Sequence, residues 1–457
     1  MHVSFLVALI ASVLSASPTV GRTDKNAPEF LWAREPAEGV KTTPPSQWST
    51  TENVAWKFDI PGLAWSSPIV WDDKIFVTTC VSTGERREPK KGLYLEELNA
   101  NKYPRDTAEH IYKVLCLDLL TGKVLWEQVA HRGIPAKPHH IKNTLASETP
   151  ATDGERIYAL FGNLGMFCYD LEGKLLWTYH IEPKNMQYGW GTSMSPTVHG
   201  DRVYIVNDNE EESWIAALDK RTGKEIWKTP RDPHSNFSTP FVWENPLRTE
   251  IVVNGRLFAI SYDMEGKELW RVEGKSAVAI PRPFERFGLL YVTSGHVAFG
   301  ENRTYAIRPG ASGNISPVEG KPTSEFLEWH SKSGPYHPTP LIIGENMYVL
   351  LDRGFMACYN AKTGKPLYEK QRIPGGRAFT SSPWTYDGKI FCLNEDGVTF
   401  VCGLGPKFEL LHRNELADDD MGMATPVIVG DKLLIRTAAR LYCIGHKPAS
   451  DTAASKE

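Results

Sequence analysis

The sequence lacks the long apolar runs of membrane-spanning proteins and the helical periodicity of helical ones. The apolar stretch Val3–Ala16 has 14 residues, whereas a membrane-spanning helix needs about 20. Positive charge is not in excess either, because 51 basic residues stand against 55 acidic ones and give a net charge of −4. The chain therefore has no global basic surface for nucleic acid, and the missing helical pattern favours an all-β domain.

The N-terminal residues predict export. The small residues Ser15, Ala16 and Ser17 end the apolar stretch, as in a secretory signal peptide, although no Lys or Arg precedes it. No cysteine precedes Cys80, so no lipid-anchor cysteine follows the signal. We expect a periplasmic or secreted monomer without a transmembrane segment. Its parts are a signal peptide (1–21), a Pro-rich leader that crosses the domain or is partly disordered (22–52), one domain (53–446) and a disordered tail (447–457).

A hairpin pattern recurs along the domain. At Cys116–Trp126 an apolar strand ends in Asp, a Thr-Gly-Lys turn follows, and a second apolar strand closes with Trp. The further copies are Cys168–Trp177, Ala217–Trp227, Ser261–Trp270 and, more loosely, Cys358–Tyr368. Five copies in register indicate a repeat protein.

Eight prolines set the length of the repeat. Each opens an apolar strand, and in seven of the eight a second strand begins seven residues later. The pairs are Pro68/Ile75, Pro150/Ile157, Pro196/Val203, Pro283/Leu290, Pro340/Met347, Pro383/Ile390 and Pro426/Leu433, with Pro240 as the eighth proline. Several of the intervals are 43 or 44 residues. Two hairpins per period make the four-stranded blade of a β-propeller, so the sequence predicts an all-β, eight-bladed propeller.

The ends of the domain predict how the ring closes. The last repeat, Thr425–Ile444, has three strands and lacks a fourth that ends in Trp. The segment Asn53–Trp56 matches the residues that precede Trp in other repeats. We therefore expect the N-terminal strand to complete the last blade and to leave no free edge.

Cysteine and tryptophan both occur at fixed repeat positions, which favours structural roles. Cys116, Cys168, Cys358, Cys402 and Cys443 share one position that is filled elsewhere by Ala217 or Ser261, so we expect small buried sites without disulfides among these five. Cys80 and Cys392 stay open. The tryptophans that end fourth strands are Trp56, Trp126, Trp177, Trp227, Trp270 and Trp329, with Tyr368 as a substitute. Their regular spacing favours packing between blades over ligand stacking.

The hairpin segments resemble the tryptophan-docking motif of the pyrroloquinoline-quinone (PQQ) repeat propellers. That family includes the quinoprotein alcohol dehydrogenases and the outer-membrane assembly lipoprotein BamB, and the segment Trp48–Pro68 resembles the opening of secreted bacterial members. The resemblance covers about residues 53–444 and implies the fold more strongly than the function. The dehydrogenases carry an adjacent Cys-Cys disulfide and Glu, Asn and Asp residues around a metal. Here no Cys-Cys pair occurs, and those three residues cannot be mapped.

A candidate site follows from propeller geometry, because the residues before each first-strand proline surround one mouth of the channel. One place before the proline the chain has Ser67, Thr149, Ser195, Thr239, Thr339, Ser382 and Thr425, whereas the fifth repeat has Arg282. These hydroxyls either face a small anionic or polar ligand or bond to backbone groups. The predicted ligand-binding residues at the mouth are Arg282, Glu148, Trp65, Met194, His337, Arg377 and Asp420. No catalytic or metal-binding residue is assigned.

The largest insertion, Ser82–His110, is dense in charge and is expected on the mouth face, where it would form a lid or a partner surface. Two functions then remain. The first is a non-catalytic, exported propeller that binds a protein, peptide or cell-envelope component through the mouth face. The alternative is a quinoprotein-like oxidoreductase that uses PQQ and a divalent cation such as Ca²⁺. The missing Cys-Cys pair and metal ligands favour the first function.

Overall fold

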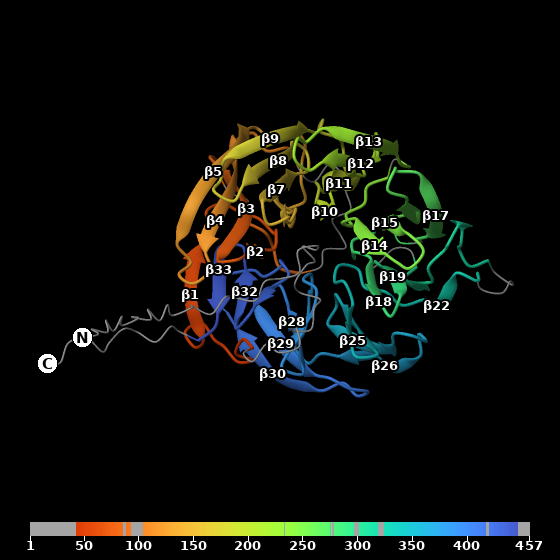
Figure 1. Cartoon of the computed structure of the whole chain (residues 1–457). Coiled ribbons are helices and arrows are strands. Elements are labelled where there is room, and N and C mark those ends of the chain that lie inside the picture. The colour runs from red at the N-terminus through yellow and green to blue at the C-terminus, as the bar shows by residue number, and fades with distance from the viewer. Residues whose placement is uncertain are drawn as a thin grey trace, which may run out of the picture.

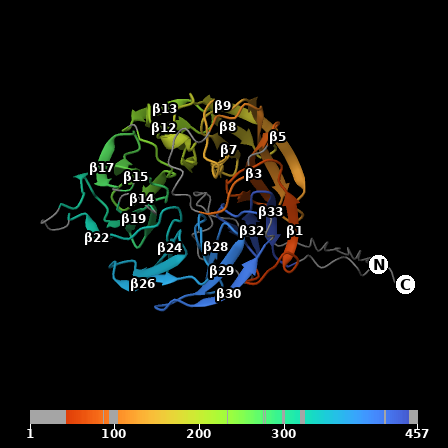
Figure 2. The same ribbon diagram turned by 180° about the vertical axis from the view of Figure 1, so that it is seen from behind.

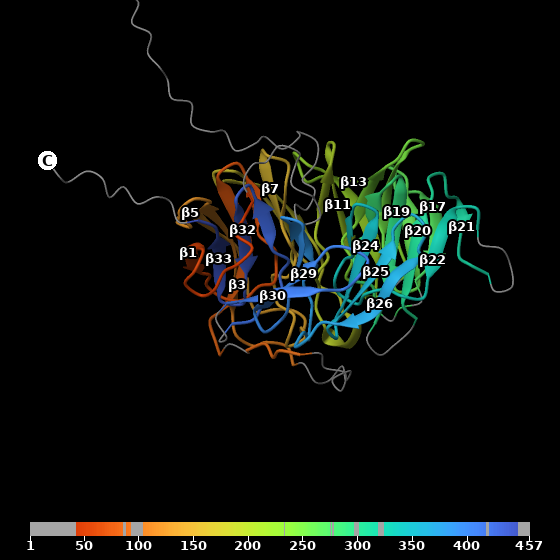
Figure 3. The same cartoon turned by 90° about the horizontal axis from the view of Figure 1, so that it is seen from below.

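The computed structural model describes residues 43–85, 88–92, 104–232, 234–274, 276, 278–296, 301–318, 324–416 and 420–446. In these residues eight β-sheets are arranged as blades around one axis (Figure 1). The same ring is seen from behind in Figure 2, and edge-on it is a thick disc (Figure 3). The predicted eight-bladed propeller is therefore confirmed. The predicted signal peptide and tail lie outside the described residues.

Each of the first four blades is an antiparallel meander of consecutive strands, and blade 4 gains a fifth strand from a later connection. Blade 1 comprises β2 (Ile69–Trp71), β3 (Lys74–Ser82), β4 (His110–Asp118) and β5 (Val124–Gly133). Blade 2 comprises β6 (Ala151–Thr152), β7 (Arg156–Phe161), β8 (Gly165–Asp170) and β9 (Leu175–His180). Blade 3 comprises β10 (Thr197–His199), β11 (Arg202–Asn207), β12 (Trp214–Asp219) and β13 (Glu225–Pro230). Blade 4 comprises β14 (Phe241–Glu244), β15 (Thr249–Val253), β16 (Phe258–Tyr262), β17 (Glu268–Glu273) and the parallel β21 (Gly313–Asn314).

The last four blades repeat the meander, and the ring closes as the sequence predicts. Blade 5 comprises β18 (Phe284–Arg286), β19 (Leu289–Ser294), β20 (Arg303–Ile307) and β22 (Leu327–Ser331). Blade 6 comprises β23 (Leu341–Ile343), β24 (Asn346–Leu351), β25 (Phe355–Asn360) and β26 (Pro366–Arg372). Blade 7 comprises β27 (Trp384–Tyr386), β28 (Lys389–Leu393), β29 (Val398–Gly403) and β30 (Leu410–Glu415). Blade 8 comprises β31 (Val427–Val429), β32 (Lys432–Arg436), β33 (Arg440–Ile444) and the N-terminal β1 (Val54–Asp59), which pairs Trp56 with Cys443.

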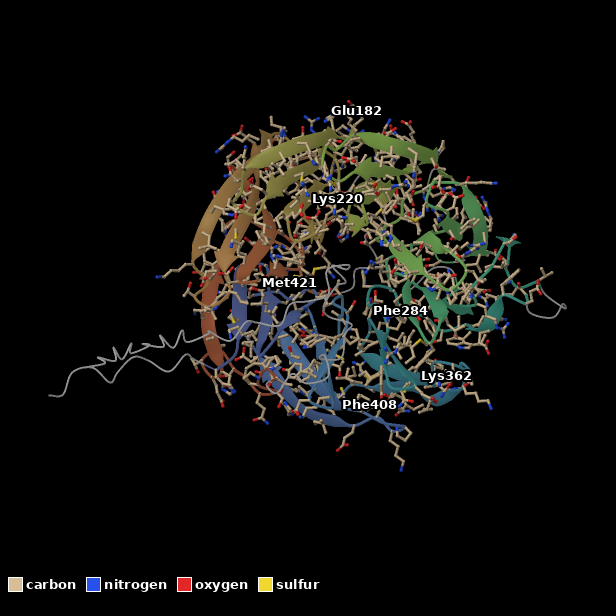
Figure 4. All side chains as sticks on the ribbon, viewed as in Figure 1. Glu182, Lys220, Phe284, Lys362, Phe408 and Met421 are labelled. Carbon is tan, nitrogen blue, oxygen red and sulfur yellow. The ribbon has the colours of Figure 1, made fainter. Side chains whose placement is uncertain are left out.

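The core is divided into separate apolar clusters between neighbouring blades. Tyr158 and Leu160 of blade 2, for example, pack against Val203 and Ile205 of blade 3. This follows from strand geometry, because alternate side chains point to opposite faces and each face meets another blade. Figure 4 places Phe284, from the innermost strand β18, and Met421 nearer the ring centre than Glu182 and Lys362.

The tryptophans dock on the following blade, as their spacing predicts. The Trp177 indole N–H, for example, donates to the Lys220 carbonyl at 3.1 Å, and the glycine of the next Thr-Gly-Lys turn, Gly223, lies against the ring. A Cβ on Gly223 would be 2.4 Å from that ring, and its φ of +70° also favours glycine. The same donation is made by Trp56, Trp126, Trp227 and Trp329, to Leu119, Leu171, Met264 and Ala361.

The described part of the leader, residues 43–52, packs against blades 7 and 8. The Trp48 ring is 4% exposed and stacks on Phe391, with 6.0 Å between ring centroids. The Trp48 backbone N–H donates to Asn414 Oδ1 at 3.2 Å. Since blade 7 has no tryptophan at the end of its fourth strand, the leader supplies one to this interface.

All seven cysteines are buried thiols. The five that share a repeat position lie in five different blades and are fully buried, which confirms their predicted packing. Burial raises the pKa of the thiols of Cys116, Cys168, Cys358 and Cys443. Among the described residues no helix has the length and apolarity to cross a membrane.

Candidate functional site

A cavity of about 340 Å³ lies at the channel mouth, and residues from all eight blades line it. Two repeat positions supply most of the wall, namely those one and three places before the strand-opening proline. Three places before the proline the lining residues are Trp65, Ser147, Ser193, Phe237, Ile280, His337, Thr380 and Met423. One place before it they are Ser67, Thr149, Ser195, Thr239, Arg282, Thr339 and Thr425. We call this space the mouth cavity.

Of the residues two places before the proline, Ala424 lines the cavity, whereas Glu148 and Met194 face the other way, because side chains of an extended chain alternate. Met194 belongs to the apolar cluster between blades 3 and 4, and Glu148 is buried beside blade 3. Neither lines the mouth cavity. The predicted position of Glu148 and Met194 at the channel mouth is therefore corrected, whereas Trp65, His337 and Arg282 line the cavity.

Glu148 is a buried carboxyl held by hydrogen bonds. Its Oε1 accepts from Thr192 Oγ1 at 2.6 Å and from the Gly162 N–H at 3.2 Å. Its Oε2 has no hydrogen-bond partner among the described residues. Burial raises the pKa of Glu148 to about 7, and these hydrogen bonds only partly offset the effect. Near neutral pH the group is therefore partly protonated.

Arg377 and Asp420, predicted at the mouth, also lie outside the cavity wall. Arg377 is exposed and forms a bidentate ion pair with Asp396, with N–O distances of 2.9 and 3.1 Å. Asp420 is buried, and its oxygens accept from the Thr437 hydroxyl and from the Ala439 N–H. The neighbouring residues 418 and 419 lie outside the described residues.

The hydroxyls around the cavity connect the blades to one another. We call Ser67, Thr149, Ser195, Thr239, Thr339, Ser382 and Thr425 the hydroxyl belt. The Ser67 N–H donates to Thr149 Oγ1 at 3.0 Å, and the Thr149 N–H donates to Ser195 Oγ at 2.9 Å. Four further bonds continue the pattern at 3.0 to 3.2 Å, at Thr239, Thr339, Ser382 and Thr425. The interpretation that these hydroxyls satisfy backbone groups is thus confirmed for the six from Thr149 to Thr425.

Arg282 interrupts the belt between blades 4 and 5. Its side chain is half-buried, its Nε lies 3.4 Å from the Pro240 carbonyl, and its guanidinium stacks 5.1 Å from the Phe241 ring centroid. The Arg282 N–H still donates to Thr339, so the backbone keeps its place in the ring. The change therefore places a cation on the cavity wall without altering the path of the chain.

On the blade 6 side, buried Asp352 positions His337. The Asp352 Oδ1 atom lies 2.5 Å from His337 Nδ1, and the carboxylate also accepts the Tyr336 and His337 N–H groups at 3.0 and 3.1 Å. This contact holds Nδ1 and leaves Nε2 for the cavity. His296 packs edge-on against Tyr336, and burial lowers the pKa of His296 to about 4, so it is neutral at physiological pH.

Lys142 and Glu395 join blades 2 and 7 at the rim of the cavity. Lys142 Nζ lies 2.5 Å from Glu395 Oε1, and both side chains are nearly or fully buried. Glu395 Oε2 accepts the Gly92 N–H at 2.7 Å, and Lys142 Nζ donates to the Gly92 carbonyl at 2.6 Å. The insertion, predicted on the mouth face, therefore reaches across the ring to blade 7 at this residue.

The sequence interpretation missed Trp190, His296 and Tyr336 on the wall and Asp352 and Glu395 beneath it. A signal for the acidic pair was present, because Asp208, Asp352 and Glu395 share one repeat position just after the second strand. Each is buried and holds a cation or an imidazole: Arg231, His337 and Lys142 respectively.

The lining does not fit PQQ with Ca²⁺. Calcium is held mainly by carboxylate and carbonyl oxygens, but no Asp or Glu is among the residues that line the mouth cavity. Among the described residues no three His, Cys, Asp or Glu side chains converge to hold a metal ion. A smaller cavity of about 170 Å³ near the insertion is lined by Asp106, His110 and His139. Asp106 Oδ2 lies 3.7 Å from His110 Nε2 and 3.6 Å from His139 Nδ1. These three side chains do not converge as metal ligands either.

Comparison with known proteins agrees with this architecture. The family described as "Outer membrane protein assembly factor BamB" matches residues 47–211 and 112–242. The outer membrane protein assembly factor BamB of Burkholderia pseudomallei (strain K96243) is 25% identical over 218 residues, which is 39% of this chain and 55% of that protein. The chain thus spans about half the length of the curated relative that it matches.

A solved structure of a BamB protein shares the fold. BamB from Moraxella catarrhalis aligns with a TM-score of 0.52 and 13% identity, over 82% of this chain and 99% of that one. Quinohemoprotein alcohol dehydrogenase from Comamonas testosteroni aligns with a TM-score of 0.45 and 14% identity, over 89% of this chain and 80% of that one. In its repeats, its eight blades and the sequence match over residues 47–211 and 112–242, the chain is similar to the PQQ-repeat, BamB-type β-propellers, with BamB as a distant relative.

Proposed function

We propose that the chain is an exported, non-catalytic propeller that binds a protein or peptide partner of the cell envelope through its channel-mouth face. One observation carries the proposal: all eight blades contribute to a single mouth cavity with aromatic and hydrogen-bonding walls. Such a concave site with a few placed polar groups is the usual form of a recognition site. The matched relative, named as an outer membrane protein assembly factor, supports a cell-envelope partner by analogy.

The donor set of the cavity supports binding over redox chemistry. The wall offers imidazoles, hydroxyls, one guanidinium, one ammonium and aromatic rings, whereas a quinone cofactor with Ca²⁺ would need carboxylate oxygens there. A partner group inserted into the cavity would instead be held by the aromatic side chains of Trp65, Trp190 and Phe237 and oriented by the polar atoms. Aromatic residues of this kind dominate the binding energy of many protein interfaces.

The test is site-specific photocrosslinking of the full chain in the cells that produce it. A photoreactive residue replaces Tyr336 at the cavity or, as a control, Glu182 at the outer edge (Figure 4), whose side chain is 76% exposed. We expect a discrete polypeptide adduct from position 336 that disappears in Trp190→Ala/Phe237→Ala, and none from position 182. No adduct from 336, or the same adducts from both positions, would count against the proposal. So would PQQ-dependent dye reduction when the purified protein is titrated with PQQ and Ca²⁺.

A further inference from the structure

We propose that the mouth cavity recognises an acidic peptide segment, with a carboxylate beside Arg282 and an adjacent apolar side chain against the aromatic wall. This inference rests on the proposed function and specifies the chemistry of the partner. It depends on three independent features of the cavity: the charge of the wall, the unused protons of the hydroxyl belt, and the size and aromatic character of the space.

The wall carries positive charge and no negative charge. Its charged residues are Arg282 and Lys142, its imidazoles are His140, His296 and His337, and neither Asp nor Glu lines it. Of the carboxyl groups beneath the wall, Glu395 holds Lys142 and Asp352 holds His337, and Glu148 is partly protonated near neutral pH because burial raises its pKa to about 7. An anion that enters therefore meets a cation and no repelling carboxylate, which favours an acidic group.

The hydroxyl belt adds donors to this wall. From Thr149 onward the belt oxygens accept a neighbouring backbone N–H, as at Thr149 and Ser195. A hydroxyl that accepts one bond keeps its own proton for donation. Within the described part of the chain no belt hydroxyl donates a hydrogen bond to another group. A carboxylate can accept several such bonds, whereas an amide or amine ligand can satisfy fewer of them.

Size and shape favour a peptide segment over a bare inorganic anion. A cavity of about 340 Å³ is at the lower end of small-molecule sites, which run from roughly 300 to 1,000 Å³, so it suits one or two side chains. Trp65, Trp190 and Phe237 give it an apolar side that a phosphate ion would leave uncovered. Trp190 Nε1 also has no acceptor among the described residues. An acidic residue next to an apolar one uses both sides of the cavity.

The experiment compares two dye-labelled peptides by fluorescence anisotropy with the purified full chain. Both have the sequence acetyl-Gly-Ser-Phe-X-Phe-Ser-Gly, with X either Asp or Asn. We expect the Asp peptide to bind about tenfold more tightly, as one charge-assisted bond would give, and the preference to weaken with salt. Arg282→Thr should remove the preference, because it places the repeat's own hydroxyl there. Arg282→Lys should keep most of it.

Matched controls separate this inference from the proposed function. Arg286→Thr removes an exposed arginine four residues away and should leave the preference unchanged. If both peptides bind equally to the parent chain and Trp190→Ala abolishes both, the mouth binds peptides but the acidic preference is wrong. If only free N-acetyl-aspartate or inorganic phosphate binds, the ligand is a small anion and the peptide assignment is wrong. If none of these probes binds and position 336 yields no crosslink, both proposals fail.

Discussion

The interface between blades 2 and 3 and the interface between blades 4 and 5 use the same motif in different ways. At the first, Trp177 donates to the backbone carbonyl of Lys220 and packs on Gly223 of the next blade. At the second, Trp270 donates to Glu250 Oε2 of its own blade at 2.6 Å. Blade 5 lacks the Thr-Gly-Lys hairpin whose glycine and preceding carbonyl receive the tryptophan ring at the first interface.

The second interface differs at its inner and outer ends as well. At the outer end β21 pairs with β17, Gly313 opposite Trp270, and covers the edge strand of blade 4. At the inner end Arg282 replaces a hydroxyl of the belt. At this interface, where the repeat pattern is interrupted, contacts within blade 4 and with β21 thus replace the docking of the tryptophan on the next blade. The same interface places Arg282, the cation of the candidate site, on the cavity wall. The difference teaches that a departure from the repeat is the place to look for function.

Breaking the Glu250 contacts should have the largest effect. Buried Glu250 accepts from Trp270 Nε1, Ser261 Oγ, Arg248 Nε and Asn245 Nδ2 at 2.6 to 3.2 Å. Glu250→Ala strands these donors, so we expect a loss of about 3–5 kcal/mol in the free energy of unfolding, as when one partner of a buried ion pair is removed. Urea denaturation followed by circular dichroism measures it.

The regular interface supplies the control for that change. Trp177→Phe removes one hydrogen bond to a carbonyl, and Lys220 O still accepts from Tyr158 Oη at 3.2 Å. The expected loss is about 1–2 kcal/mol. Equal losses in Glu250→Ala and Trp177→Phe would mean that Glu250 does not replace the missing docking site.

Gly223→Ala tests the close approach of glycine to tryptophan at the regular interface. The new Cβ would lie 2.4 Å from the Trp177 ring at a φ of +70°. We expect a loss of about 2–4 kcal/mol, the sum of left-handed backbone strain and overpacking. Gly344→Ala is the matched control, since its φ is +56° and nothing lies within 4 Å of the added Cβ. If Gly223→Ala and Gly344→Ala lose the same free energy of unfolding, the clash with the Trp177 ring adds nothing to the cost of backbone strain.

The repeat made most of the fold predictable from sequence. A proline, two hairpins and a docking tryptophan at fixed spacing determine the blade, and the missing last strand determines the closure. The candidate site was only partly predictable. Glu148 and Trp65 were placed together although they stand two and three places before their prolines, and the alternation of an extended strand sends them to opposite faces. Glu395 stands at a repeat position, but its contact with Lys142 had no signal, because Lys142 lies in a non-repeating connection far away in the chain.

Glu148 should make stability depend on pH at the interface of blades 2 and 3. Its folded pKa of about 7 lies above its usual 4.5, so the folded state binds more protons between these values. The contribution of Glu148 to the free energy of unfolding is therefore fully present below pH 4.5. It falls by roughly 3 kcal/mol in all as the pH rises to about 7. Glu148→Gln should match the parent near pH 4 and exceed it by about that amount at pH 8. Thermal melts between pH 4 and pH 8 measure the difference in stability between the two proteins. If this difference does not change with pH, the prediction is wrong.

Arg282→Thr should have the smallest effect on stability, and of opposite sign. A threonine hydroxyl at 282 would accept the Thr239 N–H, as the belt does elsewhere at 2.9 to 3.2 Å. One added bond contributes about 0.5–1.5 kcal/mol, so the melting temperature should rise slightly, while Arg286→Thr should leave it unchanged. A loss above about 1 kcal/mol would mean that the fold depends on Arg282. A gain in stability together with a lost preference for the acidic peptide would assign this arginine to the ligand, because the ring would be more stable without it.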